Sequence, residues 1–401
     1  MWTQMPKPRI LRTMTWLAPG GGVDEQAKLS ILGLSDEFEF HLLTGREIQN
    51  QDFHNIPGLK IYVCKWMVPN FNPIMDLLAL IWIKRFLRTN RFDLVHTHET
   101  KSSFLTRLAF TKKLATPLVY GIHGVVFNDP RSNLGNKIYE FLERSTIGKA
   151  DQLIAVSEDV KSEYLIRNIG TGMPWEVIYS GVDVVKFVSP QSVEKTARLR
   201  GSLGITDRDL VLINIGRFSI PKNQKDTIHA FKSICDQYPS RSLRLILVGE
   251  GPEKSNCEAL VETLDLTRKV NFVGFQNNIE DYLALSDINV ITSLREGLPR
   301  VVVESSLVGI PTVGYQVEGI SEIVSDQKSG LVVPQGDLES LVLGINELVL
   351  DAEKRIKFGI LAREIALSNW SHESMNNRIR ALYRKLLKGQ SSEFKKARAG
   401  Q

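Results

Sequence analysis

Cysteine is scarce in this sequence: the chain has three, Cys64, Cys235 and Cys257, far apart from one another. Their spacing forms no metal-binding or redox motif, and a sparse, odd number of cysteines favours a reducing compartment. Long hydrophobic runs are missing too, since the most apolar stretch, residues 77–83, is far too short to cross a membrane. The first residues lack the apolar core and cleavage site of a signal peptide. We therefore expect a cytoplasmic protein that touches a membrane only at its surface, at the inner face.

A large excess of charge of one sign is also absent. The 50 basic and 45 acidic residues leave a net charge of +5, which does not indicate a nucleic-acid partner. Hydrophobic residues at 43% and charged residues at 24% are typical of a globular protein. A chain of 401 residues is too long for one ordinary domain, so we expect two.

Short apolar runs alternate with longer amphipathic runs along most of the chain, a pattern typical of parallel sheets with crossover helices. The alternation pauses over residues 183–207 and then restarts. We predict an α/β protein with two doubly wound, Rossmann-like domains, residues 1–190 and 191–370, facing each other across a ligand-binding crevice. Residues 352–387 are predicted to be helical, with a break at Trp370-Ser371. Residues 371–401 would thus comprise a helix that returns toward the first domain, followed by a disordered basic tail. The predicted strands are residues 10–17, 38–43, 59–63, 94–97, 118–122, 152–156 and 175–179, then 210–215, 243–248, 270–273, 288–291, 312–314 and 331–333.

Two glutamates in residues 295–306 are the most informative feature. Glu296 lies in a Gly/Pro turn, and Glu304 lies inside an apolar run, where a carboxylate is unfavourable unless something pairs with it. Pro299 suits the first turn of a helix. The N-terminus of that helix would direct amide groups and positive dipole toward a pocket bordered by Glu296 and reached by Glu304. Such a pocket suits an anionic group with neighbouring hydroxyls, as in a nucleotide sugar.

Cations follow the first strand of the second domain, in the loop that contains Gly216-Arg217 and Lys222-Asn223. Arginine forks around phosphate oxygens and lysine supplies a point charge, so the loop fits a pyrophosphate group. The alternative is an ordinary charged loop in solvent.

A glycine run, residues 20–22, follows the first strand and precedes a helix, where glycine lets the backbone approach a phosphate closely. The G-x-G-x-x-G spacing of a dinucleotide fingerprint is missing, although Glu37 or Glu39 could serve as the acid that binds ribose. A plain tight turn is the alternative.

Histidines lie at the ends of two predicted strands. His96 and His98 share one face of a strand and could form half of a metal site, but no remaining ligand cluster is evident. We expect one of them to pack against the sheet and the other to face the crevice. His123 could bond a sugar hydroxyl or cap a loop carbonyl.

Residues 74–88 form an apolar segment that ends in three cations. A basic amphipathic surface of this kind could rest on anionic lipid. The favoured alternative is a helix buried against its sheet, with its basic residues in solvent. The basic residues of this region are Lys84, Arg85, Arg88, Arg91, Lys101, Arg107, Lys112 and Lys113.

Taken together, these segments resemble the retaining nucleotide-sugar glycosyltransferases of family 4, which have the GT-B fold. The second half carries INIGRFSIPKNQ, LRLILVGEGPE, VNFVGFQNNIEDYLALSDI, REGLPRVVVESSLVGIPTVGY and EGISEIVSDQKSGLVVP in the family order. The first half resembles the family more loosely, through DLVHTHETKSSFLTRLA, GIHG, ADQLIAVSE and VIYSGVD, with Ser180 where many members have asparagine. The resemblance covers about residues 10–387 and implies an acceptor-side first domain and a donor-binding second domain.

The resemblance implies a role for each matching residue. Arg217 and Lys222 would bind the donor diphosphate and stabilise its leaving charge, while Glu296 and His123 would contact the donor sugar near the reacting centre. Glu304 would hold the ribose hydroxyls. Further donor contacts are implied for Gly21, Gly22, Gly216, Phe275, Gly297, Leu298, Pro299, Arg300 and Glu322.

No metal or cofactor is implied, because the cations and the helix end supply the positive field. The resemblance implies a nucleoside-diphosphate sugar as donor, with UDP favoured over GDP, and a glycan or lipid-linked hydroxyl as acceptor. The pathway would be surface polysaccharide or glycoconjugate synthesis. A nucleotide-binding oxidoreductase, a catalytically silent sugar-nucleotide-binding protein and a GT-B epimerase are the alternatives.

Overall fold

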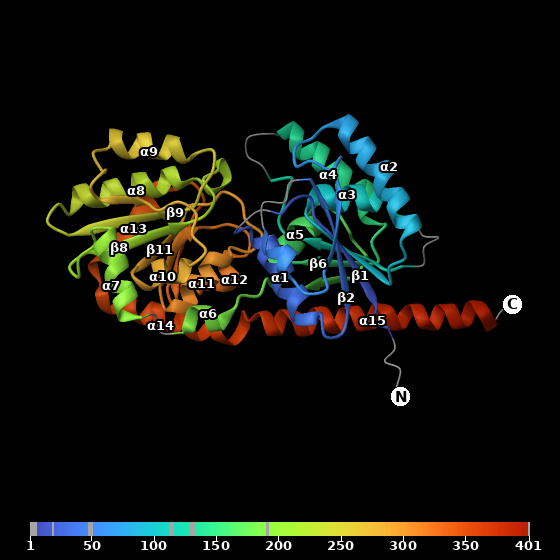
Figure 1. Ribbon diagram of the computed structural model, residues 1–401. Coiled ribbons are helices and arrows are strands. Elements are labelled where there is room, and N and C mark those ends of the chain that lie inside the picture. Colours follow the sequence, from blue (N-terminus) through green and yellow to red (C-terminus); the bar gives the residue numbers. More distant parts are fainter. Residues whose placement is uncertain are drawn as a thin grey trace. The chain divides into compact units, whose positions relative to one another are not determined.

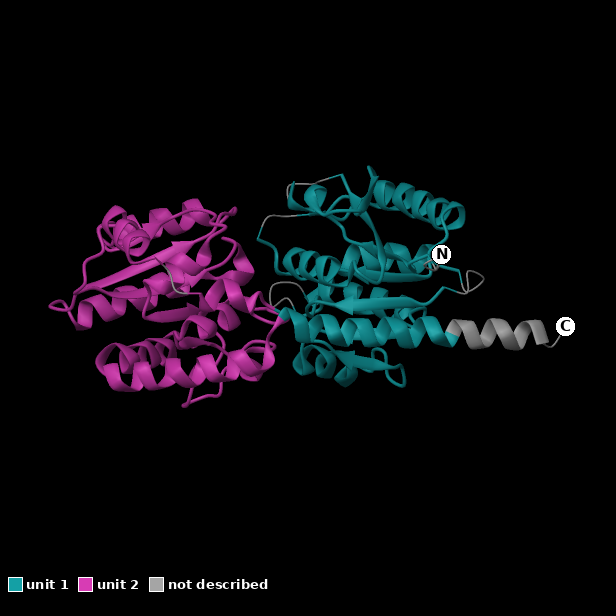
Figure 2. Cartoon of the chain, turned by 60° about the horizontal axis from the view of Figure 1, so that its bottom comes forward, with its two compact units in different colours: residues 1–181, 372–401 teal, residues 182–371 magenta. Residues whose placement is uncertain are grey.

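The computed structural model describes residues 6–17, 20–46, 51–111, 116–128, 133–189 and 192–399, with side chains to residue 389 in the last helix. The chain divides into two compact units, which Figure 2 shows in teal and magenta. Unit 1 comprises residues 1–181 and 372–401, and unit 2 comprises residues 182–371. The chain therefore leaves unit 1, builds unit 2 and comes back to unit 1 for its last helix.

Unit 1 is built on a seven-stranded sheet in the order β3-β2-β1-β4-β5-β6-β7, with every neighbouring pair parallel. Each strand predicted for the first domain has its counterpart in this sheet. Parallel strands buried on both faces are expected to be rich in apolar residues, as residues 118–122 are, whereas residues 60–64 at the sheet edge are more exposed. The strands are β1 Arg9–Thr13, β2 Glu39–Gly45, β3 Lys60–Cys64, β4 Leu94–His98, β5 Leu118–Ile122, β6 Gln152–Ala155 and β7 Trp175–Val177.

Helices α2, α3 and α4 cover one face of the sheet in unit 1, and α1 lies beside the C-terminal helix α15 (Figure 1). The core on the α1 side includes Met375, Ile379 and Tyr383 of α15, so the last helix completes the hydrophobic core of unit 1. The sequence predicts a helix ending near residue 387, whereas α15 continues to Ala399. The helices are α1 Gly22–Leu34, α2 Pro73–Thr89, α3 Thr100–Ala109, α4 Asn133–Ile147, α5 Glu158–Ile166 and α15 His372–Ala399, with the 3-10 turn η1 Gln51–Asn55.

Unit 2 has a six-stranded parallel sheet in the order β10-β9-β8-β11-β12-β13. Its strands also correspond to those predicted from the apolar runs, so the α/β prediction is confirmed for both units. The strands are β8 Leu210–Ile215, β9 Leu243–Val248, β10 Val270–Phe272, β11 Ile288–Ile291, β12 Thr312–Tyr315 and β13 Gly330–Val333.

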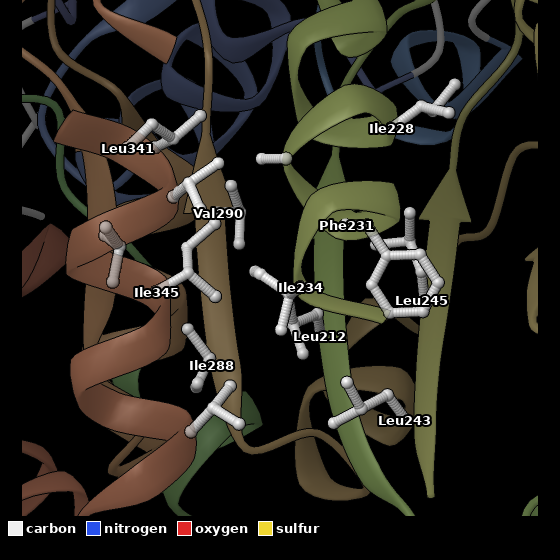
Figure 3. Packing of buried hydrophobic residues seen from close by; sticks show 14 of the residues in the cluster. Leu212, Ile228, Phe231, Ile234, Leu243, Leu245, Ile288, Val290, Leu341 and Ile345 are labelled. Atoms are coloured by element: carbon white, nitrogen blue, oxygen red, sulfur yellow. The ribbon is translucent and has the colours of Figure 1, made fainter. Parts of the chain in front are cut away.

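Helices α8 and α13 press apolar side chains against the strands of unit 2 (Figure 3). Phe231 and Ile234 of α8 and Ile345 of α13 are fully buried in this cluster. The predicted break at Trp370-Ser371 is confirmed, because α14 ends at Asn369 and α15 begins at His372. The helices are α6 Val184–Val188, α7 Val193–Ser202, α8 Gln224–Gln237, α9 Lys254–Thr263, α10 Ile279–Ala284, α11 Arg300–Val308, α12 Ile320–Ile323, α13 Leu338–Leu350 and α14 Ala352–Asn369, with the 3-10 turn η3 Ile220–Lys222.

Each sheet has one place where the strand order reverses direction. In unit 1 this switch point lies between β1 and β4, and in unit 2 it lies between β8 and β11. Loops leaving neighbouring strands diverge there, which opens a ligand-binding crevice at the carboxyl ends of the strands. The two switch points are therefore the places where functional side chains are expected.

Candidate functional site

The switch point of unit 2 brings together the two loops that carry the predicted cations and the first glutamate. The loop after β8 leads through Gly216 and Arg217 into η3, and the loop after β11 leads to Glu296. Thr292 ties the loops together, because its Oγ1 donates a hydrogen bond to the carbonyl of Asn223 at 2.8 Å. Asn223 has a left-handed backbone with φ 48, which ends the turn and begins α8. The hydrogen bond between the loops that follow β8 and β11 therefore holds Lys222 in position.

Lys222 and Glu296 form a direct ion pair in this loop cluster, with 2.5 Å between Nζ and Oε1. The Glu296 side chain is only 11% exposed, and that of Lys222 is 31% exposed. A carboxylate at this depth is stabilised by its cationic partner, and the partner keeps two of its three donors for other groups. The pair is therefore a cation held in place beside a carboxylate at the switch point.

Helix α11 begins directly after this turn, at Arg300, and Pro299 precedes it without a side-chain cap. The sequence places Pro299 in the first turn, and the structure places it one position earlier. The helix ends at Val308, and the C-cap Gly309 has a φ of 87, in the left-handed region that suits glycine. Its N-terminus contributes backbone amides and positive dipole to the same turn that holds Glu296.

Glu304 lies within α11 and is buried, with 8% of its surface exposed. Its partner is Arg300, one turn earlier, whose Nη2 lies 3.4 Å from Oε1. This pair supplies the compensation that a carboxylate in an apolar run requires. The resemblance implies a donor contact for Arg300 but no pairing with Glu304, although the two residues have the four-residue spacing of one helical turn.

Close backbone approaches shape this edge of unit 2. A Cβ atom at Gly249 would lie 2.1 Å from the carbonyl oxygen of Gly216, and one at Gly319 would lie 2.7 Å from that of Gly297. Both glycines also have positive φ, 140 and 76. Larger residues there would displace the loops that carry Gly216, Gly297 and Leu298.

The remaining predicted donor contacts of unit 2 follow other strands at the same edge of the sheet. Phe275 follows β10 and is 39% exposed, so its ring is accessible for stacking. Glu322 lies on α12, after β12, and is partly buried. The structure joins Lys222 with Glu296 and Arg300 with Glu304. It places Phe275 after β10 and Glu322 after β12, on opposite sides of the loops that follow β8 and β11.

The glycine run of unit 1 leads into α1. Gly20 has φ 71, Gly21 is the N-cap residue, and the helix begins at Gly22. The carbonyl of Gly21 accepts the first helical hydrogen bond, from the amide of Glu25 at 3.0 Å. The run therefore forms a helix N-terminus that follows β1, at the switch point of unit 1.

Both acids that could have bound a dinucleotide ribose are already engaged. Glu37 accepts two hydrogen bonds of 2.7 Å from the guanidinium of Arg384 on α15. Glu39 pairs with Lys60 at 2.7 Å and with His41 at 3.1 Å. These pairs weigh against the oxidoreductase alternative.

His96 and His98 are both buried, at 3% and 2% exposure, with ring centroids 4.1 Å apart. The expectation that one of them faces a crevice is wrong. Residues that are two positions apart on a strand point to the same side, and both of these side chains are buried. His98 Nδ1 instead lies 2.8 Å from Nε2 of His123, which is partly exposed after β5. His123 is bonded to another side chain and does not cap a loop carbonyl through that nitrogen.

The described ranges contain no group of three His, Cys, Asp or Glu side chains that could hold a metal ion. In the histidine cluster the two facing nitrogens of His98 and His123 are hydrogen-bonded to each other, which leaves no space for an ion between them. Half of a metal site at His96 and His98 is therefore not completed by His123.

Burial lowers the pKa of each histidine in the cluster, and Arg12 lowers it further, to about 4 for His123. Nearby, burial raises the pKa of Glu99 to about 7, although its carboxylate accepts a 2.6 Å hydrogen bond from the amide of Thr15. The histidines are thus neutral at pH 7, while Glu99 titrates close to that pH.

These shifts predict how stability depends on pH. Between pH 6.5 and 4 the unfolded chain binds protons on histidines that stay neutral in the folded protein, so acidification lowers the melting temperature. Glu99 acts in the opposite direction, because between pH 4.5 and 7 its folded carboxyl binds more protons than the unfolded one. The melting temperature should therefore fall more steeply between pH 8 and pH 5 for Glu99→Gln than for the wild type. Parallel curves for the two proteins would contradict the raised pKa of Glu99.

Comparison with known proteins identifies the family. The model of Glycosyltransferase Family 4 matches residues 21–186, and the model of Glycosyl transferases group 1 matches residues 195–365. EpsD of Bacillus subtilis is 29% identical over 301 residues, which cover 74% of this chain and 77% of EpsD. A UDP-Gal:alpha-D-GlcNAc-diphosphoundecaprenol alpha-1,3-galactosyltransferase of Escherichia coli is 24% identical over 323 residues, 80% of this chain and 82% of that protein.

The solved structure of HepE from Anabaena, in complex with UDP, matches the fold with a TM-score of 0.75 at 23% identity. The match covers 95% of this chain and all of HepE. The two family models follow each other along the chain and together span most of it. The chain therefore belongs to glycosyltransferase family 4 and has the GT-B fold.

Proposed function

We propose that this protein transfers a sugar from a nucleoside-diphosphate sugar to a hydroxyl acceptor, with retention of the anomeric configuration, in surface polysaccharide or glycoconjugate synthesis. The observation that carries the proposal is the Lys222–Glu296 ion pair at the switch point of unit 2, beside the N-terminus of α11. It offers a cation to a diphosphate and a carboxylate to the hydroxyls of the attached sugar within one loop cluster.

Donor binding in this proposal uses the residues at the edge of unit 2. Lys222 and Arg217 bind the diphosphate, whose charge is also favoured by the amide end of α11. Glu296 accepts hydrogen bonds from donor-sugar hydroxyls, and Glu304 accepts them from the ribose. Phe275 lies against the nucleobase.

The chemical step follows from where charge develops. Breaking the bond between sugar and phosphate leaves negative charge on the diphosphate and oxocarbenium character on the sugar. Lys222, Arg217 and the helix amides stabilise the first charge from fixed positions, which is the most effective form of electrostatic catalysis. In this proposal the departing phosphate takes the proton of the acceptor hydroxyl on the same face of the sugar, and no metal ion is needed.

A panel of nucleotide sugars tests the proposal. A ligand that binds only the folded state stabilises it, by about 2.7 kcal/mol at a hundred times its Kd. We expect UDP-sugars to raise the melting temperature more than GDP- or ADP-sugars, since HepE was solved with UDP and the Escherichia coli relative is named for UDP-Gal. A response to nicotinamide dinucleotides with none to any nucleotide sugar would reject the proposal. The anomeric configuration of the product, read by NMR, tests retention.

We also propose that the acceptor is lipid-linked and that helices α2 and α4 of unit 1 rest on the membrane that holds it. No helix within the described ranges is long and apolar enough to span a bilayer. The buried side of α2 holds Ala79, Ile83, Phe86 and Leu87, yet large apolar side chains also lie in solvent on both helices. Those exposed by half or more are Phe71, Ile74, Leu77 and Ile81 around α2, and Leu134, Ile138 and Phe141 on α4.

The basic residues of this region divide into two groups. Lys84, Arg85 and Arg88 are exposed on α2, where they can meet anionic head groups. Arg107 is buried, so it cannot be part of that surface, and Lys101 pairs with Asp76 at 2.7 Å. Lys112 and Lys113 lie outside the described residues. The contact surface thus combines protruding apolar residues with the cations of α2, a composition typical of interfacial helices.

A triple variant, Ile74→Ser, Leu77→Ser and Ile81→Ser, is expected to lose flotation with vesicles that contain anionic phosphatidylglycerol at low salt. These side chains are 73%, 58% and 57% exposed, so their loss removes membrane-burying area with little effect on the core. Leu343→Ser is the matched control, because Leu343 is 61% exposed on α13 of unit 2. Equal flotation of wild type and triple variant would reject this contact surface.

A further inference from the structure

Arg12 lies in the middle of β1 and is 1% exposed, an unusual position for a guanidinium. Its described hydrogen-bond partners include no carboxylate. Nη1 donates to Ser30 Oγ at 2.7 Å and lies 3.5 Å from His98 Nε2, and Nη2 donates to Tyr383 at 3.2 Å. The face of Phe40 lies 5.3 Å from the guanidinium carbon. Because a guanidinium can only donate hydrogen bonds, the polar groups that bond to it must act as acceptors.

One chain of hydrogen bonds leads from Arg12 to the predicted donor-sugar residue. Arginine can only donate, so Nε2 of His98 must present its lone pair to Nη1. Neutral His98 then carries its proton on Nδ1, which lies 2.8 Å from Nε2 of His123. Nε2 of His123 must therefore be the acceptor, and neutral His123 carries its own proton on Nδ1.

A second series of hydrogen bonds, from Arg12 to His96, passes through Tyr383 of the C-terminal helix. The hydroxyl of Tyr383 accepts from Arg12 and lies 2.7 Å from Nδ1 of His96. We assign the hydroxyl as the donor to Nδ1, because no other acceptor for its proton is described. His96 is then protonated on Nε2, the opposite nitrogen from that in His98. Burial raises the pKa of Tyr383, which keeps this proton on the hydroxyl. The two histidines on β4 thus hold opposite tautomers although they share one face of the strand.

We propose that Arg12 is a positioning residue that determines which ring nitrogens of His96, His98 and His123 carry protons. We call these three residues the histidine relay. As a result, His123 presents a protonated Nδ1 to its ligand. The opposite arrangement would set an N–H of His98 against the N–H groups of Arg12, which is repulsive. Gly121 of β5 makes room for the relay, because a Cβ there would lie 3.0 Å from His96 Nε2 and 3.2 Å from His98 Nδ1.

The relay defines what His123 does if it contacts the donor sugar, and this step rests on the proposed function. A protonated Nδ1 donates to a sugar or phosphate oxygen and cannot remove a proton from a hydroxyl. The pKa of His123, lowered to about 4 by burial and by Arg12, keeps the ring neutral at the pH where the enzyme would work. His123 is thereby a hydrogen-bond donor for the ligand and not a general base.

A small cavity next to the relay is consistent with the tautomer assigned to His96. It is lined by Arg12, Gln26, His96, His98 and His123 and measures about 10 Å³, close to the space that one water needs. Nε2 of His96 is buried there without a protein partner. In the assigned tautomer this nitrogen bears a proton, so a water in the cavity would accept its hydrogen bond.

Nitrogen-15 NMR of the full chain with labelled histidines tests the relay, because long-range proton–nitrogen correlations report which ring nitrogen bears the proton. At pH 7.5 we expect the Nδ1–H form for His98 and His123 and the Nε2–H form for His96. His123→Asn serves to assign the signals. An Nε2–H form of His123 in the wild type would overturn the proposal, whether or not the protein binds a nucleotide sugar.

Variants test the two series of hydrogen bonds separately. Arg12→Met should abolish the fixed Nδ1–H forms of His98 and His123 and weaken donor binding roughly two- to tenfold, the size expected for one hydrogen bond. Tyr383→Phe should change the signals of His96 alone, and it keeps the test decisive if Arg12→Met fails to fold. A change at His123 in Tyr383→Phe, or none in folded Arg12→Met, would contradict the relay. If the tautomers are as expected but His123→Asn binds the donor normally, the relay stands and the donor contact of His123 is refuted.

Discussion

We expect Lys222→Ala to lower turnover by roughly two to three orders of magnitude, the effect of removing one fixed charge that stabilises a transition state. Folding should change much less. The Lys222 side chain is 31% exposed, and ion pairs at that exposure contribute little to stability. The cost that remains is a carboxylate, Glu296, left without its cation at 11% exposure. Activity should therefore fall far more than the melting temperature.

Three further variants sharpen this experiment. Lys222→Arg keeps the positive charge and should retain part of the turnover. Lys225→Ala is the matched control, because Lys225 lies three residues further on, is 46% exposed and pairs with Glu253 at 3.2 Å. It should turn over at close to the wild-type rate. Combining Lys222→Ala with Glu296→Ala should recover stability without recovering turnover, since the unpaired carboxylate is gone but the cation is still missing.

Near-native turnover of folded Lys222→Ala would reject the phosphate role of Lys222. An equal loss in Lys225→Ala would show that turnover depends on the total positive charge near the loop and not on the position of Lys222. A large fall in kcat with an unchanged KM would indicate that Lys222 acts on the leaving diphosphate and not on donor binding in the ground state.

The architecture was predictable because it depends on local patterns. Most strands of the two parallel sheets are largely buried, so they appear in the sequence as short, mainly apolar runs between turn residues. Runs at residues 118–122, 210–215, 243–248 and 288–291 coincide with β5, β8, β9 and β11. The end of the last helix was not predicted, because α15 continues past residue 387.

Part of the site was also visible in the sequence. Glu296 and Lys222 stand in short motifs that follow strands, and the switch-point rule places such loops together. The buried pair Arg300 and Glu304 has the spacing of one helical turn and could have been recognised. The donor roles of these residues are predictions that rest on the resemblance and on the ion pairs at the switch point of unit 2.

The histidine relay could not be predicted, because it depends on long-range packing. Arg12 and Tyr383 are 371 positions apart, and they meet only because α15 returns to the core of unit 1. His98 and His123 are 25 positions apart and meet through the register of β4 with β5, where His98 lies beside Gly121. The local signal was Arg12 itself, a cation inside the otherwise uncharged strand predicted at residues 10–17.

Glu143→Ala is expected to cause the largest loss of stability. Glu143 of α4 and Arg107 of α3 form a fully buried ion pair, with Nη2 at 3.0 Å and 3.1 Å from the two carboxylate oxygens. Tyr120 completes the group, because its hydroxyl donates to Glu143 at 3.2 Å and its ring lies 3.9 Å from the guanidinium carbon. Removing the carboxylate leaves the arginine buried and unpaired, which costs about 3–5 kcal/mol.

Glu140→Ala is the matched control, because Glu140 lies on the same helix and pairs with Arg144 at 2.6 Å in solvent. We expect it to cost less than about 1 kcal/mol. Thermal unfolding followed by circular dichroism distinguishes the two, with a shift of roughly 10 °C for Glu143→Ala and a few degrees at most for Glu140→Ala. Equal shifts would mean that water reaches Arg107 when its partner is removed. The double variant Arg107→Met, Glu143→Leu then decides whether the pair stabilises the fold. A melting temperature at or above that of the wild type would show that the pair adds no net stability over apolar side chains.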